Sequence, residues 1–354
     1  MSEKKIRGSR SSIVIAILLL VVIITPPTIM TTITINRVYG QQPDQIDLLN
    51  TTDSSANIQN MTVKKVHVGD IDIAYKMLGK GDPIILFSGA SDNMDAWDPS
   101  LLAGISSNHT VIVFDQRGIG NTTLGTNPYT PEQLANDTAG LLDALKIPKA
   151  DVMGYSLGSY LAEQLTMMHP DKVNSLILIG SSCGGKDHTP KPPEFLELQS
   201  VIVNNSLNNI PTTQEQIKSL VTASLGSGWI KLHPESLEGF ENITTFQQLK
   251  PAVNPEMVNN QNNVGKHWED NPNWSGACEE LAKLDKPTLV ITGTDDDFYA
   301  PHVNSLKIVE KIPGAWLVQI KNAGHAVPDQ YPDEISKILQ TFLSTTTATT
   351  AQPE

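Results

Sequence analysis

Gly154-Tyr155-Ser156-Leu157-Gly158 is the stretch of sequence that decides the fold. It lies between a short, largely apolar run, 151–153, and an amphipathic helical pattern that starts near Leu157. This arrangement is typical of a sharp strand-to-helix turn that holds a serine in strained backbone geometry, with glycines where the turn is crowded. The N–H groups of the following helix then point at the serine. A loop serine that caps a helix is the alternative interpretation, because G-x-S-x-G also arises by chance.

An acid and a histidine complete the set that a serine nucleophile requires. They must follow in that chain order, each at the end of a later strand. Residues 287–293 read as a buried parallel strand that leads into three aspartates, Asp295–Asp297. Residues 315–320 read as another strand, and His325 alone among the eight histidines follows a strand directly through a glycine turn. We therefore expect His325 to be the general base.

Further landmarks stand in order along residues 63–343. They are a strand and oxyanion loop at 84–90, Trp97, the segment Asp-Gln-Arg-Gly-Ile-Gly-Asn-Thr at 115–122, and a strand at 176–179. Together with the serine turn, the aspartates and the Gly-His pair, they resemble the α/β-hydrolase family. The resemblance implies an α/β fold class, the α/β-hydrolase fold: a mostly parallel eight-stranded sheet, helices on both faces, and a mostly helical cap insertion.

The oxyanion loop departs from the family pattern in one respect. Ser88-Gly89 stands where the family more often has His-Gly. A backbone N–H donor depends on backbone geometry and not on a side chain, so the N–H groups of Ala90 and Leu157 remain the expected oxyanion hole.

The acid also departs from the family pattern. In the family it usually falls three residues after the glycine, which selects Asp296, but the run of three leaves Asp295 and Asp297 open. The aspartates that are not used would cap a helix that begins near Pro301, or would solvate the loop.

The resemblance implies a mechanism without a metal ion or organic cofactor. His325 removes the proton of Ser156 as the serine attacks an acyl carbonyl, and Asp296 orients the imidazole and stabilises its cation. Water then releases the acyl-enzyme. Epoxide hydrolases and haloalkane dehalogenases of the family carry aspartate at the turn, because attack on an alkyl carbon needs a carboxylate. The serine argues against those reactions.

Hydrophobic periodicity divides the chain into a core, an insertion and flanking segments. The core is predicted to span 61–183 and 277–343, with strands at 63–68, 71–77, 84–88, 111–114, 150–153, 175–180, 288–292 and 315–320, and helices at 131–146, 157–168, 301–311 and 331–343. Residues 184–276 are rich in Asn, Pro and Gln and contain apolar helical segments. They predict a lid that covers the serine. Residues 344–354 are predicted to be a disordered tail.

The N-terminus carries a membrane signal. Basic residues at positions 4, 5, 7 and 10 precede an uninterrupted apolar run, 13–24, and no charge follows until Arg37. Residues 1–40 therefore predict either a signal peptide cleaved near 38–40 or a membrane anchor kinked by the prolines at 26 and 27. In either case the hydrolase is expected to face outward, at the cell membrane or secreted. Residues 41–60 are polar and predict a flexible linker.

The charge of the chain bears on its partners. Residues 1–40 hold five basic residues and one acidic residue, so the rest carries a formal net charge of −17, against −13 for the whole chain. A body this acidic is a poor partner for phosphate backbones and anionic membrane surfaces. We expect a small-molecule acyl substrate, no nucleic-acid partner, and membrane contact only through the N-terminal segment if it is uncleaved.

Two cysteines, Cys183 and Cys278, flank the predicted cap. In an oxidising exterior they could pair and join both ends of the lid to the core. Two separate thiols are the alternative, because a bridge requires Cα atoms within about 7 Å of each other, which a sequence does not show.

The favoured function is hydrolysis of a carboxylic ester or lactone with a small or medium acyl group. A peptidase of the proline iminopeptidase type and a C–C bond hydrolase are the enzymatic alternatives. We rank the peptidase lower because no acidic pair in the predicted cap is assignable to a substrate α-amino group. A non-catalytic binding module on the same scaffold is the alternative of a different class, and the full set of Ser156, Asp296 and His325 argues against it.

Overall fold

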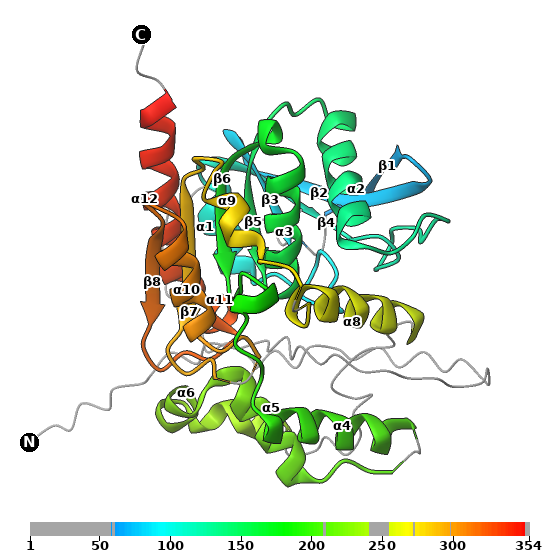
Figure 1. Cartoon of the computed structure of the whole chain (residues 1–354), viewed down its shortest axis with the longest axis vertical. Coiled ribbons are helices and arrows are strands. Elements are labelled where there is room, and N and C mark those ends of the chain that lie inside the picture. The colour runs from blue at the N-terminus through cyan, green and yellow to red at the C-terminus, as the bar shows by residue number, and fades with distance from the viewer. Residues whose placement is uncertain are drawn as a thin grey trace, which may run out of the picture.

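The fold is built on an eight-stranded sheet (Figure 1). The computed structural model describes Ile58 and residues 61–207, 210–240, 255–271, 273–297 and 299–350. In their order across the sheet, the strands are β1 (Lys64–Val68), β2 (Ile71–Leu78), β4 (His109–Phe114), β3 (Asp82–Phe87), β5 (Ala150–Tyr155), β6 (Val173–Ile179), β7 (Thr288–Gly293) and β8 (Trp316–Ile320). β2 is antiparallel to both neighbours, and all other pairs are parallel. The eight predicted strands and the mostly parallel α/β architecture are confirmed.

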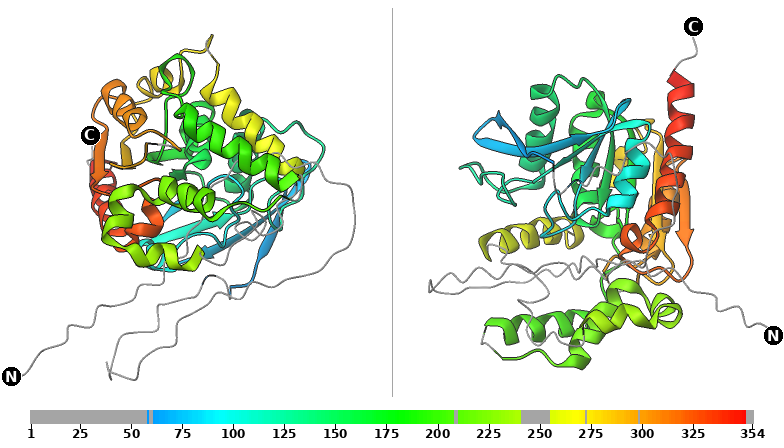
Figure 2. Two further views of the ribbon diagram at one scale, coloured as in Figure 1. Left: turned by 90° about the horizontal axis from the view of Figure 1, so that it is seen from below. Right: turned by 180° about the vertical axis from the view of Figure 1, so that it is seen from behind.

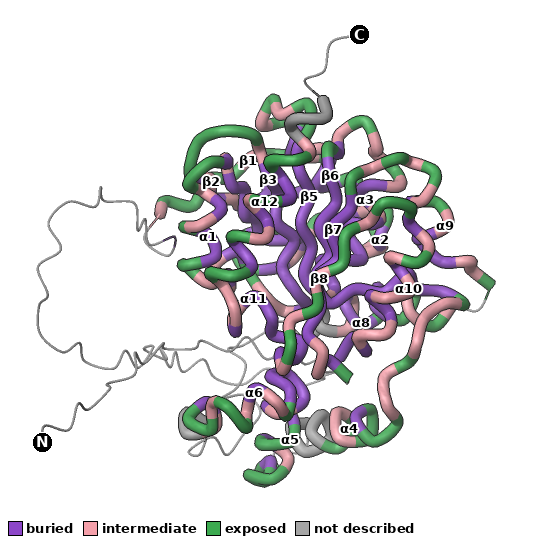
Figure 3. Tube along the Cα trace, turned by 90° about the vertical axis from the view of Figure 1, so that its left-hand side faces the viewer, coloured by how far each residue is buried: buried purple, intermediate pink, exposed green. Residues whose placement is uncertain are grey.

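Burial increases from the edges of the sheet to its centre (Figure 3). Every residue of β5 and β7 is buried, whereas the edge strands β1 and β8 contain only exposed and half-buried residues. Central parallel strands are covered on both faces and therefore read as continuous apolar runs. β4 lies on one side of β3 and β5 on the other, so the strand order reverses there. Sheets of this kind bind ligands at the carboxyl ends of the strands beside such a reversal.

Helices cover both faces of the sheet (Figure 3). On one face α1 (Pro99–Ser106) packs against α12 (Pro332–Thr350), and the other face carries α2 (Pro131–Ala144), α3 (Leu157–Met168), α9 (Ala277–Leu281) and α10 (Val303–Lys311). The predicted helices at 131–146, 157–168 and 301–311 correspond to α2, α3 and α10. The shorter elements of the core are the 3₁₀ turns η2 (Pro170–Lys172) and η3 (Gly185–Asp187) and the helix α11 (Val327–Gln330).

Local sequence explains where two core helices begin. Asp98 accepts hydrogen bonds from the first N–H groups of α1, and Thr130 accepts one from Gln133 N in α2, where Pro131 follows the cap. Such side chains satisfy N–H groups that have no partner inside the helix. α3 has no side-chain cap. Its first N–H groups are therefore not consumed by a cap.

The insertion between β6 and β7 is mostly helical, as predicted. α4 (Pro193–Leu207), α5 (Gln214–Leu225), α6 (Ser227–Leu232) and the 3₁₀ turn η4 (Pro234–Phe240) form a layer beyond the carboxyl ends of the parallel strands (Figures 1 and 2). α8 (Pro255–Glu269) lies closer to the core and packs against α3. We call these elements the cap. α5 begins with a capping box in which Thr213 and Gln216 satisfy each other's backbone N–H groups.

The C-terminal helix is longer than predicted. We expected it to end at Leu343 and a disordered tail to follow, but α12 continues to Thr350. In its last turns the hydroxyls of Thr345 and Thr346 donate to backbone carbonyls one turn earlier, at 2.7 and 2.9 Å. Hydroxyls of Thr can bond within a helix in this way, so a threonine-rich composition alone does not end one.

The predicted N-terminal segment, 1–40, lies outside the described residues, as does the linker at 41–60 apart from Ile58. Within the part of the chain that the structure describes, no helix has both the length and the apolar character that crossing a bilayer requires. The signal peptide and the membrane anchor therefore both stay predictions.

Cys183 and Cys278 form a disulfide bond, and their Cα atoms are 5.2 Å apart. Of the two alternatives that the sequence left open, the structure contains the bridge. Cys183 follows β6 and Cys278 lies in α9, so the bond joins the segments that lead into and out of the cap. A hydrogen bond of 2.7 Å from Ala277 N to Cys183 O lies beside it.

Replacing both cysteines (Cys183→Ala with Cys278→Ala) is expected to lower the free energy of unfolding by about 2–4 kcal/mol, because the unfolded chain regains the freedom that the bond removes. Denaturant unfolding with and without reductant measures this. Reductant should destabilise the unsubstituted protein and leave the double variant unchanged. Equal unfolding midpoints of the two proteins without reductant would contradict the assignment.

Candidate active site

The turn between β5 and α3 holds Ser156 in strained backbone geometry. Its φ of 55° and ψ of −124° lie outside the regions that non-glycine residues usually occupy. The flanking glycines are needed for close approach: a Cβ on Gly154 would lie 2.4 Å from Gly158 O, and one on Gly158 would lie 2.3 Å from Phe87 O. The missing side chains therefore let α3 begin directly against the end of β3, as the sequence pattern predicts.

Ser156, His325 and Asp296 form one hydrogen-bonded row. His325 Nε2 lies 2.9 Å from Ser156 Oγ, and His325 Nδ1 lies 2.6 Å from Asp296 Oδ2. His325 and Asp296 are each 1% exposed, so the protein shields their contact from water. The rings of Tyr155 and Tyr299 lie against the imidazole, with centroids 5.3 and 5.1 Å away. These contacts hold the imidazole between the hydroxyl and the carboxylate.

Asp296 is the aspartate that contacts the histidine. Its second oxygen, Oδ1, accepts a hydrogen bond of 3.1 Å from Ala300 N, which fixes the carboxylate in the loop after β7. The spacing argument that selected Asp296 therefore identified the residue that lies against His325.

The other two aspartates have structural partners. Asp295 Oδ2 accepts from Gly228 N at 2.7 Å and so connects the acid loop to α6 of the cap. Asp297 Oδ1 lies 3.0 Å from His302 Nδ1. Neither caps α10, which begins without a side-chain cap, so that part of the expectation is wrong. Despite these carboxylates, the described residues contain no group of His, Cys, Asp and Glu that could hold a metal ion.

Ala90 and Leu157 lie beside the serine, as expected for an oxyanion hole. Both are buried and both line the same cavity as Ser156. Among the described residues, neither backbone N–H has a hydrogen-bond acceptor. Two unpaired N–H groups next to a hydroxyl can stabilise negative charge that develops on a substrate oxygen.

Two glutamines that the sequence analysis did not identify hold the oxyanion loop. Gln116 Nε2 donates to Ser88 O at 3.0 Å, and Gln261 Oε1, on α8, accepts from Ser91 N at 2.8 Å. Ser91 has a φ of 65°, a left-handed conformation that this bond helps to maintain. Gln116 lies in the recognised 115–122 segment, whereas Gln261 is 170 residues away from Ser91 and had no sequence signal.

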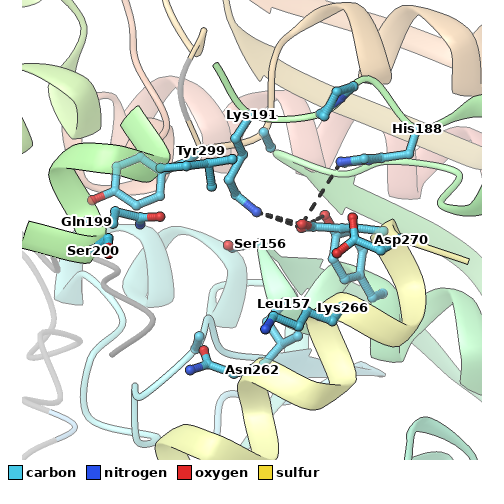
Figure 4. Close-up of a pocket in the computed structure, with 17 residues that line it drawn as sticks. Ser156, Leu157, His188, Lys191, Gln199, Ser200, Asn262, Lys266, Asp270 and Tyr299 are labelled. Atoms are coloured by element: carbon cyan, nitrogen blue, oxygen red, sulfur yellow. Dashed lines mark hydrogen bonds and ion pairs between the residues drawn. The ribbon is translucent and has the colours of Figure 1, made fainter. Parts of the chain in front are cut away.

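A cavity of about 380 Å³ opens beside Ser156 (Figure 4). Its wall combines core residues such as Tyr160 and Tyr299 with cap residues such as Leu196, Gln199 and Asn262. Because α4 and α8 both contribute, the cap determines the shape of the space that a substrate enters. The volume lies at the lower end of the range of about 300–1,000 Å³ that is usual for small-molecule sites.

A charged cluster forms one wall of the cavity. Lys191 Nζ lies 2.7 Å from Glu269 Oε2, and Tyr160 Oη donates to Glu269 Oε1 at 2.9 Å (Figure 4). Burial opposes ionisation of Glu269, but the charges of Lys191 and His188 outweigh it and hold the pKa of this carboxyl below its usual value. Asp270 lines the cavity too. The sequence analysis found no acidic pair in the cap that is assignable to a substrate α-amino group; the structure places two adjacent acidic residues, Glu269 and Asp270, at the cavity, with Glu269 paired to Lys191.

Comparison with known proteins identifies the family. A family model described as the alpha/beta hydrolase fold matches residues 82–331. The chain belongs to the α/β hydrolase family. As a member of it, with relatives that are named as hydrolases, the protein is an enzyme of the hydrolase class.

The relatives of this α/β hydrolase differ in their named activities. A putative carbamate hydrolase, RutD, from Azorhizobium caulinodans is 25% identical, with 78% of this chain and 96% of the relative aligned. The proline iminopeptidase PfmaB from Pestalotiopsis fici is 25% identical over 79% of this chain and 99% of its own. A solved structure, a thermophilic esterase from Thermogutta terrifontis, shares the fold with a TM-score of 0.63 and 24% identity, covering 81% of this chain and 99% of that one.

Asp296→Asn is expected to lower kcat for hydrolysis of a p-nitrophenyl ester by about 10⁴-fold, because an amide cannot hold the imidazole in the productive tautomer. Asp295→Asn and Asp297→Asn are matched controls in the same loop, and each should change kcat by less than about tenfold, the scale of one neutral hydrogen bond. A larger loss in either control than in Asp296→Asn would show that the acid is misassigned.

Gln261→Ala is expected to lower kcat by about tenfold, because Ser91 N loses a buried acceptor and the oxyanion loop is released. Asn263→Ala, an exposed neighbour on the same helix, is the control and should retain full activity. Steady-state kinetics on both variants, with circular dichroism to confirm folding, measures this. Equal kcat values for the two variants would rule out a role of the cap in holding the loop.

Proposed function

We propose that this α/β hydrolase cleaves a carboxylic ester or lactone through an acyl-enzyme formed on Ser156. The observation that carries the proposal is the hydrogen-bonded series of Ser156, His325 and Asp296, whose serine lines a cavity together with Ala90 and Leu157. A nucleophile, a base, an acid that orients the base, and an oxyanion site together suffice for acyl transfer.

The proposed reaction proceeds in two steps. His325 Nε2 takes the proton of Ser156 Oγ as the oxygen attacks the acyl carbon, and the N–H groups of Ala90 and Leu157 bind the resulting oxyanion. The C–O bond of the ester then breaks, and His325 returns the proton to the departing alkoxide. Water attacks the acyl-enzyme with His325 again as base, which releases the acid and restores Ser156. Asp296 stabilises the imidazolium in both steps.

The cavity supports a small or medium acyl group. The cavity has a volume of about 380 Å³, and the ionised Lys191–Glu269 pair forms one of its walls. A long alkyl chain is disfavoured in that direction, because it would lie against buried charges. Tyr299 on the core side and Leu196 on the cap side supply apolar surface.

A peptidase that releases N-terminal residues is the second candidate. Glu269 and Asp270 in the cavity favour it, because a substrate ammonium needs a carboxylate partner, and one relative is named as a proline iminopeptidase. Lys191 argues against a peptidase, because its Nζ already lies 2.7 Å from Glu269 Oε2 and pairs with that carboxylate. We therefore rank ester hydrolysis first. The same row of residues also serves a C–C bond hydrolase, for which we find no specific contact.

The location that we propose follows from the sequence alone. The basic and apolar N-terminal segment, 1–40, directs the chain to a membrane, and the catalytic domain lies outside the cell, either anchored or secreted. The Cys183–Cys278 disulfide supports an oxidising compartment.

A fluorophosphonate probe is expected to label the protein stoichiometrically and to leave Ser156→Ala unlabelled, because only an activated serine attacks the probe. Intact mass spectrometry measures the adduct. A well-folded protein that is not labelled would favour a non-catalytic binding module.

A panel of p-nitrophenyl esters beside aminoacyl p-nitroanilides separates the two enzymatic candidates. Esters of short and medium acids should show the higher kcat/KM, and Lys191→Ala should raise the activity on anilides because it frees Glu269 for an ammonium group. A preference of the unsubstituted enzyme for anilides would overturn the ranking.

A further inference from the structure

A chain of buried polar side chains runs behind the nucleophile. Ser159 Oγ lies 2.5 Å from the backbone carbonyl oxygen of Ser156, Ser181 Oγ lies 2.7 Å from Ser159 Oγ, and Glu163 Oε1 lies 2.7 Å from Ser181 Oγ. The side-chain members, Ser159, Ser181 and Glu163, are 0% exposed. His325 contacts Ser156 at its side-chain hydroxyl. The series Ser159–Ser181–Glu163 contacts the same residue at its backbone carbonyl.

Two elements bring the chain together. Ser159 and Glu163 are four residues apart on α3, so their side chains lie on the same face of the helix. Ser181 follows the end of β6, the strand next to β5. These hydrogen bonds therefore connect α3, the end of β6 and the turn that contains Ser156.

The direction of each hydrogen bond follows from counting protons. A carbonyl oxygen has no proton, so the contact of 2.5 Å between Ser159 Oγ and Ser156 O requires the Ser159 hydroxyl to donate. Ser159 has no second proton, and Ser181 must donate to it. Ser181 then has none left, so the contact with Glu163 Oε1 is filled only if Glu163 carries a proton and donates it.

The surroundings of Glu163 agree with a neutral carboxylic acid. Among the described residues no Lys, Arg or His forms an ion pair with it, and its other oxygen, Oε2, has no hydrogen-bond partner. Tyr160, a titratable residue that interacts with Glu163 electrostatically, has its hydroxyl bound to Glu269. Burial raises the pKa of Glu163 well above its usual value, against the opposing effect of Ser181. An unpaired buried carboxylate would be far more costly than the neutral acid.

We propose that Glu163 is a positioning residue for the nucleophile: as a neutral carboxylic acid it donates to Ser181 and thereby directs the Ser159 hydroxyl onto the carbonyl of Ser156. The same carbonyl also accepts from Ser159 N at 2.8 Å. Two donors on one oxygen fix the peptide plane after Ser156, the plane that contains the Leu157 N–H. The chain thus supports both the strained turn and one donor of the proposed oxyanion hole.

Ionisation of Glu163 would reverse the direction in which the hydrogen bonds between Glu163, Ser181 and Ser159 are donated. Its oxygens could only accept, so Ser181 would donate to Glu163 and Ser159 to Ser181, and Ser156 O would lose its hydroxyl donor. The proton on Glu163 therefore decides which way the two hydroxyls point.

Infrared spectroscopy tests where the proton lies. The difference spectrum between the unsubstituted enzyme and Glu163→Gln at neutral pH should show the carbonyl band of one protonated carboxylic acid, with a shift in D₂O. A difference spectrum that contains only carboxylate bands would overturn the proposal. This measurement needs no substrate, so its result does not depend on the proposed ester hydrolysis. The kinetic test does rest on that proposed function.

Kinetics test what the proton does. Glu163→Gln keeps a donor toward Ser181 and should retain kcat within about twofold, whereas Glu163→Met has a similar size but no donor and should lower kcat about three- to tenfold at similar KM. Ser181→Ala should cause the same loss, and the double variant with Glu163→Met should lose no more than either single variant. A Glu163→Gln variant as impaired as Glu163→Met would overturn the proposal. If Glu163→Met does not fold, the infrared result and Glu163→Gln decide.

Discussion

The close packing of α3 against the end of β3 is the constraint on which the rest of the site depends. It requires glycine at positions 154 and 158, because any Cβ there would overlap backbone oxygens. It also forces Ser156 into a backbone conformation that a serine rarely adopts. As a result, the Ser156 hydroxyl projects beyond the end of the sheet, and no side chain caps the first N–H groups of α3. The sheet supplies the rigidity that maintains this strain, since β5 is buried along its whole length.

The cap takes part in building the site as well as covering it. Gln261 on α8 holds Ser91 in the oxyanion loop, and Gly228 at the start of α6 donates to Asp295 in the acid loop. Glu269 binds Lys191 and Tyr160, so a single carboxylate connects α8, the segment before α4 and the core helix α3. Movement of the cap would therefore disturb two loops that carry proposed catalytic groups, and the Cys183–Cys278 bond limits that movement at the base of the cap.

The elements that the sequence predicts well are those whose physical cause is local. The central strands are continuous apolar runs, the serine turn needs two glycines at fixed spacing, and the acid and the histidine each follow a strand. For these reasons the sequence could name Ser156, Asp296, His325, Ala90 and Leu157, which the structure brings together, as the candidate site. Contacts between distant polar side chains leave no such pattern. Gln261 resembles any other polar residue of a helix, and Glu163 resembles an exposed residue until the structure shows it fully buried. The helical end of α12 was missed because its threonines bond within the helix.

The central claim is that the strained turn makes Ser156 the nucleophile. Pre-steady-state kinetics with p-nitrophenyl acetate test it most directly. We predict a burst of p-nitrophenol equal to the enzyme concentration, and an acetyl group on the peptide that contains Ser156 when the reaction is quenched during the burst. Turnover without a burst, or activity that persists at the original rate in Ser156→Ala, would contradict the account.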